Sequence, residues 1–121
     1  MQINLETADK HAVQSYTATE LKINHEFYRE NLIISRDKII SSWQATAIQQ
    51  LTMELMEPML QCQPEIIIIG HNLTGAQPPM AIMQALSKLR VGIECMSIGA
   101  ASRTFNILLS EHRDVVLAIL F

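Results

Sequence analysis

At 121 residues, with 49% hydrophobic and 17% charged residues, the chain is long enough for one domain (1–121) with a sizeable core, and a disordered protein is excluded. The formal net charge of −3, with Lys and Arg scattered singly, predicts no nucleic-acid partner, because nucleic-acid binders normally show a basic face. No apolar run is long enough to cross a bilayer, so no transmembrane segment is expected.

The first part of the chain predicts an antiparallel β meander. Residues 1–11 are polar and irregular, which is typical of a loosely ordered end. Asn24-His25 predicts a two-residue hairpin turn, and residues 35–38 predict a second turn. The strands around these turns are expected at residues 13–17, 21–23, 27–28, 32–34 and 39–40.

A short helix is expected after this meander. Thr52 is placed to cap it, and the helix would run to about Leu60 with Met56 and Met59 on one side. Pro58 lies inside this window, so the helix should be short or kinked. Residues 43–51 carry no clear pattern.

From residue 64 onward, buried strands alternate with helices. The β-branched run at 66–69 predicts a strand covered on both faces, and further strands are expected at 93–96 and 115–120. This βαβαβ order predicts right-handed crossovers and a locally parallel sheet. The fold class is therefore α/β, with a mixed central sheet whose antiparallel part comes from the N-terminal meander.

Two helices connect these three strands. The first should begin at Pro78-Pro79 and stop before Gly92. Phe105 lies at the centre of the buried stripe of the second. The residues expected on the buried faces are Ile82, Leu86 and Leu89 in the first helix, and Ala101, Phe105, Leu108 and Leu109 in the second.

The carboxyl ends of the two neighbouring parallel strands form a candidate ligand site, since ligands of open parallel sheets bind beyond these ends. The helix that starts at Gly99 also offers free backbone N–H groups to an anion. The candidate residues are Gly70, His71, Asn72, Ser97, Gly99 and Arg103. One interpretation is a crevice for a small anionic or polar ligand, with or without enzymatic activity.

The alternative interpretation of the same residues is structural. Gly70 and Gly99 would permit tight turns, while Arg103 pairs with a carboxylate such as Glu94. Arg113 is a second candidate partner for Glu94. We favour the structural interpretation, because helix starts and ion pairs need no ligand.

No motif indicates a cofactor, a metal site or a catalytic residue. The four histidines show no metal-ligand spacing, and the phosphate loop, nucleophile elbow, paired CxxC and HExxH motifs are absent. Cys62 and Cys95 lie in apolar surroundings, which indicates free thiols and a reducing, cytoplasmic compartment.

Three segments resemble the Mth938-like domain family (DUF498), which includes the mitochondrial complex I assembly factor 3 and uncharacterised bacterial proteins. The segments are 64–70, 92–96 and 99–111, of which Arg-Thr-Phe-Asn at 103–106 is the most specific. The sequence departs from the family pattern at His71-Asn72, Ser97, Ser102 and Phe105, where members usually have Thr-Gly, Asp, Cys and Tyr.

The resemblance implies a three-layer α/β fold and no established enzymatic activity. Because the mitochondrial relative acts in assembly through protein partners, it also implies a small non-catalytic protein that binds other proteins. A homo-oligomer is compatible with the sequence. Binding of a small ligand in the Gly70/Gly99 crevice is the alternative function.

Overall fold

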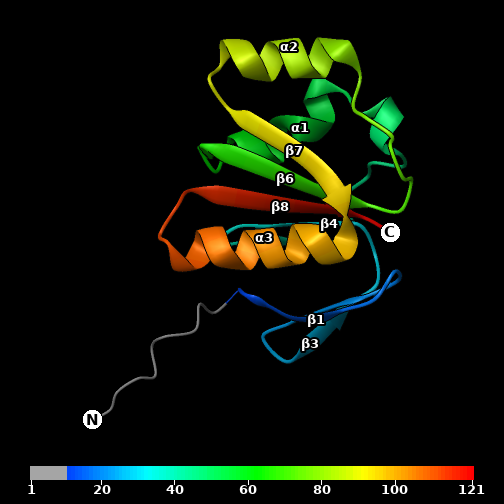
Figure 1. Ribbon diagram of the computed structural model, residues 1–121, viewed down its shortest axis with the longest axis vertical. Coiled ribbons are helices and arrows are strands. Elements are labelled where there is room, and N and C mark those ends of the chain that lie inside the picture. The colour runs from blue at the N-terminus through cyan, green and yellow to red at the C-terminus, as the bar shows by residue number, and fades with distance from the viewer. Residues whose placement is uncertain (1–10) are drawn as a thin grey trace.

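The structure is a computed structural model that describes residues 11–121, and its main element is a mixed five-stranded sheet (Figure 1). The strand order is β5-β4-β8-β6-β7. The bounds are β4 (Leu32–Ile34), β5 (Ile39–Ile40), β6 (Ile66–His71), β7 (Gly92–Ser97) and β8 (Val115–Leu120). The three C-terminal strands are parallel, whereas β4 runs antiparallel to both β8 and β5. The expected α/β class and mixed central sheet are confirmed.

A smaller antiparallel sheet contains β1 (Val13–Tyr16), β2 (Leu21–Ile23) and β3 (Glu26–Tyr28). The predicted turn between β2 and β3 is confirmed, because Asn24 and His25 both have positive φ, as a tight hairpin turn requires. The N-terminal strands are antiparallel as expected, but they are divided between the two sheets.

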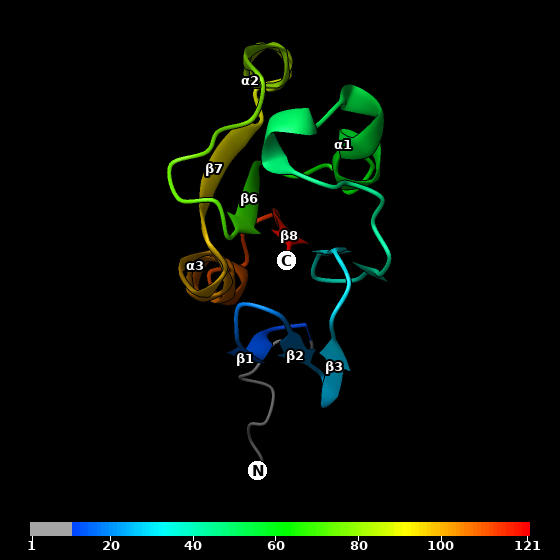
Figure 2. The ribbon, with the colours of Figure 1, turned by 90° about the vertical axis from the view of Figure 1, so that its right-hand side faces the viewer.

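The layers on the two faces of the main sheet are visible in Figure 2. On one face lie α1 (Met53–Leu60), α2 (Met80–Lys88) and the short 3-10 helix η2 (Ile48–Gln50). On the other face lie α3 (Ile98–Ser110) and the small sheet. The predicted three-layer arrangement is confirmed.

Alternation along the strands explains why two separate cores form. In β6, Ile67 and Ile69 pack toward α1 and α2, whereas Ile68 packs toward α3. Phe105 is completely buried in the α3 core, as the sequence predicts. Because both faces of β6 and β8 are covered, β8 is apolar along its whole length, and β6 is apolar up to His71 at its carboxyl end.

The helix α1 follows its sequence pattern. The Oγ1 atom of Thr52 accepts a hydrogen bond from the Leu55 amide at 3.2 Å, which confirms the predicted cap. Trp43, in the segment without a clear pattern, is buried against this layer, and its indole N–H donates to the Leu55 carbonyl at 2.9 Å. The helix keeps Pro58 inside it and is only eight residues long.

The end of α2 differs from the prediction. Arg90, with φ of 61°, takes the left-handed position after the helix, and Gly92 is already the first residue of β7. The amide of Val91 closes the turn by donating to the Leu86 carbonyl at 3.0 Å. Since α2 ends at Lys88, Leu89 falls outside the buried stripe and is 55% exposed.

Two asparagine side chains join segments that are far apart in the sequence. In Asn106, Oδ1 accepts from the Val13 amide at 2.8 Å and Nδ2 donates to the Val13 carbonyl at 2.9 Å. In Asn31, Oδ1 accepts from the Phe121 amide at 2.8 Å and Nδ2 donates to the Ala45 carbonyl at 2.7 Å. Asn106 thereby attaches the small sheet to α3.

The expected loose N-terminal end, residues 1–11, falls almost wholly outside the described residues. The exception is His11, which is buried, and its Nδ1 lies 2.7 Å from the Ser35 carbonyl oxygen. His11 is therefore part of the packed structure rather than of a loose end.

Candidate functional site

The six candidate residues lie at the carboxyl ends of β6 and β7, where α3 begins. His71 is opposite Ser97 in the parallel ladder, and Gly70 is opposite Met96. Asn72 follows β6 directly, and its Nδ2 donates to the Ala18 carbonyl at 3.0 Å, which ties this loop to the β1–β2 turn. The two strand ends therefore meet at one edge of the sheet, as the parallel topology requires.

Gly70 is not open to a ligand on its α3 side. A Cβ atom at this position would lie 2.9 Å from both the Ala101 Cβ and the Ile119 Cδ1, and 3.1 Å from the Ile98 Cα. The glycine is required because the first turn of α3 packs directly on the β6 backbone. This part of the expected crevice is filled by the core.

Gly99 has a similar role at the surface. A Cβ atom here would lie 2.7 Å from the Tyr16 Cε1, so the glycine leaves room for the tyrosine ring on the first turn of α3. Arg103 donates from Nη1 to the Tyr16 hydroxyl, and its guanidinium lies 5.8 Å from the centre of the Tyr16 ring. Tyr16 was not among the candidate residues, because nothing in a short polar strand indicates contact with a helix 87 residues away.

The expected ion pair between Arg103 and Glu94 is wrong. Both residues are described, and neither a hydrogen bond nor an ion pair joins them. Glu94 is exposed, because β7 is the edge strand of the sheet and leaves this side chain in water. Arg113, the other candidate partner, instead makes two hydrogen bonds to Glu65, at 2.8 and 3.2 Å.

A hollow of about 380 Å³ lies beside His71, at the carboxyl ends of β6 and β7. We call it the His71 hollow. Its lining residues are His71, Asn72, Thr74, Gly75, Ala76, Gln77, Cys95, Met96 and Ser97. This volume is at the lower end of the range for small-molecule sites. None of the lining residues is Asp, Glu, Lys or Arg.

The hydrogen bonds of His71 define its chemistry. The ring is 7% exposed, and Nδ1 accepts from the Leu73 amide at 3.1 Å. Burial lowers the pKa of His71, so the ring is neutral at pH 7. A neutral ring that accepts at Nδ1 carries its proton on Nε2, and this N–H has no partner among residues 11–121. His71 is thus a buried residue in the lining of the hollow whose Nε2–H has no acceptor among the described residues.

This arrangement does not suit a Cys–His catalytic pair. Burial raises the pKa of Cys95 to about 11, so the thiol stays protonated, whereas a nucleophilic cysteine acts as the thiolate. The proton on Nε2 of His71 also prevents that nitrogen from acting as a base. Both cysteines are unpaired, as the sequence predicts.

A second, shallower hollow of about 250 Å³ adjoins the first. Asn72 and Ser97 line both, and Tyr16 and Gly99 belong to the second alone. Ser97 caps α3, since its Oγ accepts from the Ala100 amide at 3.2 Å. Ile98 and Gly99 at the start of α3 line the second hollow and not the His71 hollow.

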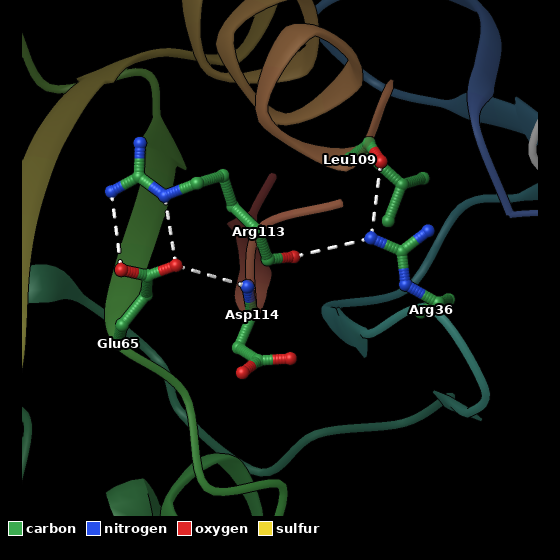
Figure 3. A network of polar contacts seen from close by, with 5 residues as sticks. All are labelled: Arg36, Glu65, Leu109, Arg113 and Asp114. Carbon is green, nitrogen blue, oxygen red and sulfur yellow. Dashed lines mark hydrogen bonds and ion pairs between the residues drawn. The ribbon is translucent and has the colours of Figure 1, made fainter. Parts of the chain in front are cut away.

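Charged side chains gather at the opposite end of the sheet (Figure 3). A smaller hollow of about 180 Å³ there is lined by Arg36, Arg113 and Asp114, among others. Glu65 binds the Arg113 guanidinium through both oxygens and accepts from the Asp114 amide at 3.2 Å. The hydrogen bond from Arg113 lowers the pKa of Glu65. Arg36 donates to the carbonyls of Leu109 and Arg113, at 3.0 and 3.2 Å, at the carboxyl end of α3. These contacts serve the fold, because they join strand and helix ends.

Metal ligands do not gather in the part of the chain that the structure describes. Among residues 11–121, no three side chains of His, Cys, Asp or Glu are placed to hold a metal ion together. His71 in particular has only neutral neighbours in its hollow.

A comparison with known protein families identifies relatives of this chain. A family model described as a protein of unknown function (DUF498/DUF598) matches residues 13–120. The chain belongs to this family. The DUF498 match includes every described strand and helix, so the resemblance seen in the sequence is confirmed.

Individual relatives of this DUF498 protein include one sequence match and solved structures with the same fold. The 13 kDa major membrane protein of Francisella tularensis subsp. holarctica (strain LVS) is 26% identical over 103 residues, which is 84% of each chain. The solution structure of a Xanthomonas campestris protein is 26% identical, with a TM-score of 0.83, over 97% of this chain and 89% of that one. A Bordetella pertussis Mth938-like domain, 21% identical, has a TM-score of 0.80 over 99% and 92%.

The name of the Francisella relative refers to a membrane. Within residues 11–121 of the present protein, no helix has the length and apolar character needed to cross one. The name describes the relative alone.

Proposed function

We propose that this protein is a non-catalytic binding protein that holds a small polar ligand in the His71 hollow. The observation that carries the proposal is that His71, a buried residue in the lining of the hollow, has an Nε2–H without an acceptor among the described residues. A buried donor without an acceptor costs free energy unless water or a ligand completes it. The adjoining uncharged polar side chains of Thr74 and Gln77 support a site that orients a polar molecule.

The chemistry of Cys95 and His71 supports a non-catalytic role. A protonated Cys95 thiol and a histidine that already carries its proton on Nε2 provide neither nucleophile nor base. Among the departures from the family pattern, His71-Asn72 and Ser97 lie at this edge of the sheet. We infer that the ligand preference of this chain is set by these positions.

The test is a fragment titration followed by NMR. Neutral, anionic and cationic fragments are added to the full chain, and the amide signals of His71, Asn72, Gln77 and Ser97 are monitored. Hits whose shifts cluster on these residues and saturate support the proposal. Failure of every charge class to perturb them would reject it.

A matched pair of variants controls for non-specific binding. Gln77 and Gln44 are both exposed loop residues, and only Gln77 lines the hollow. Gln77→Trp should block the fragment shifts, and Gln44→Trp should leave them unchanged. Equal binding by both variants would place the fragments elsewhere.

A protein partner is the second candidate function, as the family resemblance implies. Two exposed apolar residues at this end of the sheet favour it: Leu73, 49% exposed, follows Asn72, and Met80, 70% exposed, begins α2. A photo-crosslinking residue at position 80 should capture one defined partner, or a second copy of the chain, that the same residue at Phe27 does not. Equal yields from both positions would argue against an interface here.

We also propose that the protein works in the cytoplasm. The unpaired Cys62 and Cys95 support a reducing compartment. Fractionation of the native host, with the membrane pellet washed in high salt, provides the measurement. Recovery in the washed pellet would contradict the proposal.

A further inference from the structure

We infer that the ligand of the His71 hollow is uncharged and binds through a carbonyl oxygen. This inference rests on the proposed function and specifies the ligand class. The sequence leaves open whether the ligand is anionic or neutral and polar. The inference selects the neutral class. The argument depends on which charges and which hydrogen-bond donors line the hollow.

The first step concerns charge. A charged ligand that leaves water needs a compensating charge, and the hollow has no Asp, Glu, Lys or Arg in its lining. The two titratable groups there, His71 and Cys95, are both held in their neutral forms by burial. An anion or a cation would therefore enter without a counter-charge.

The second step concerns the start of α3, which would otherwise attract an anion. Ser97 occupies one amide of the first turn, because its Oγ accepts from Ala100. The next residues, Ile98 and Gly99, line the shallow neighbouring hollow, close to the Arg103 guanidinium. An anion is better placed on the side of that neighbouring hollow, because Gly99 in its lining lies beside the Arg103 guanidinium.

The third step concerns hydrogen bonding. The Nε2–H of His71 can only donate, and the Ser97 hydroxyl, which already accepts, has its own proton free to donate. A ligand atom that meets either of these donors must accept. A carbonyl oxygen has two lone pairs and carries no charge, so it meets both conditions. The adjacent Ala76, Cys95 and Met96 provide an apolar wall for the rest of the molecule.

The experiment compares acetamide with acetate, which have nearly the same shape and differ in charge. Each is titrated into the full chain at pH 7 and constant ionic strength, and the His71 ring signals are followed by NMR. So small a probe binds weakly, with a Kd on the order of millimolar or higher. Acetamide should shift the His71 signals saturably, at concentrations where acetate does not. His25, exposed in the β2–β3 turn, is the internal control.

The outcomes separate this inference from the proposed function. Shifts of His71 by acetate that equal or exceed those by acetamide would overturn the neutral class and leave the binding site in place. If neither probe perturbs His71 and the fragment titration is also negative, the hollow holds water only, and both proposals fail. If fragments bind but only charged ones do, the ligand class is again wrong.

The source of the carbonyl is tested in a separate arm. N-acetylglycinamide presents two peptide carbonyls, and acetone presents one carbonyl without an amide. A preference for the peptide mimic would identify a segment of a protein partner as the source, and equal shifts would indicate a small metabolite. His71→Phe, which retains an aromatic ring and lacks the N–H, should remove the response of the Asn72 and Ser97 amides to acetamide. A persisting response would contradict donation from Nε2.

Discussion

Gly70 shows how one missing Cβ atom permits the contact between α3 and β6. In Gly70→Ala, the new atom would lie 2.9 Å from the Ala101 Cβ and 3.1 Å from the Ile98 Cα. Because backbone atoms of α3 must move, we expect the free energy of unfolding to fall by about 1–3 kcal/mol. Urea denaturation followed by circular dichroism gives the value.

Gly92→Ala is the matched control for this substitution. Its nearest neighbour, the Glu65 carbonyl oxygen, would be 3.6 Å from the new Cβ, an ordinary contact, and its φ is not positive. We expect a change within about 0.5 kcal/mol. Equal losses in both variants would show that Gly70 is needed for strand conformation rather than for the approach of α3.

The contact between Arg103 and Tyr16 can be tested by its effect on stability. A double-mutant cycle of Tyr16→Phe and Arg103→Met should show a coupling of about 0.5–1 kcal/mol, since the hydroxyl and the guanidinium are in contact. The corresponding cycle with Glu94→Gln should be additive within about 0.5 kcal/mol, because Glu94 and Arg103 do not touch. Both cycles are measured by thermal and urea unfolding. Strong coupling to Glu94 would restore the ion pair expected from the sequence.

For single residues, the sequence predicted which of them lie at the site better than it predicted their contacts. Gly70, His71, Ser97 and Gly99 were identified because parallel strands place their carboxyl ends together. The partner of Arg103 was missed, because a charged side chain suggests a carboxylate and the aromatic ring of Tyr16 belongs to the distant small sheet. The tautomer of His71 also required the structure, since it depends on the Leu73 amide.

At the scale of elements, α3 has a buried and an exposed face. Substitutions on these two faces should change the free energy of unfolding by very different amounts. Phe105→Ala removes a completely buried aromatic ring and should cost about 3–5 kcal/mol. Ile107→Ala, on the same helix at a position 57% exposed, should change stability by less than about 1 kcal/mol. The difference between the two denaturation midpoints tests the assignment, and similar midpoints would refute it.

The attachment of the small sheet to α3 depends on Asn106. Asn106→Asp keeps the acceptor for the Val13 amide but loses the donor to the Val13 carbonyl, and it places a carboxylate beside that oxygen. We expect a loss of about 1–3 kcal/mol and faster hydrogen exchange in β1 and β2. Exchange rates in β6 should stay close to those of the parent. Uniform acceleration across both sheets would mean that the small sheet does not open separately.

The helices and strands were predicted where local patterns determine them. Thr52 followed by an apolar stripe, the turn at Asn24-His25 and the run at 66–69 each carry their own signal. The end of α2 was misplaced, because glycine is the usual left-handed residue after a helix and here Arg90 takes that position. Long-range side-chain hydrogen bonds, such as those of Asn106, leave no local pattern in the sequence, because the residues that they join are far apart in the chain.

At the scale of the whole molecule, His71 links stability to pH. Its folded pKa is lowered by burial from the ordinary 6.5, so above 6.5 the ring is neutral in both states and its contribution is complete. As the pH falls below 6.5, the unfolded chain takes up the proton first, and stability is lost until the folded pKa is passed. His71→Gln should flatten this part of the stability curve. The ring titration followed by NMR should show the lowered pKa directly, and a pKa above 6.5 would contradict the burial argument.

The placement of Trp43 has a practical consequence for following the unfolding of this protein. It is the single tryptophan of the chain, and it is buried beside α1 with its indole bonded to the Leu55 carbonyl. Its fluorescence therefore reports on the layer that contains α1 and α2, while the layer that contains α3 and the small sheet is spectroscopically silent at that wavelength. Adding a tryptophan at Phe105 in a Trp43→Phe background would give the opposite layer its own optical signal. In each chain, a fluorescence transition that coincides with the circular-dichroism transition would show that both cores unfold in one cooperative step.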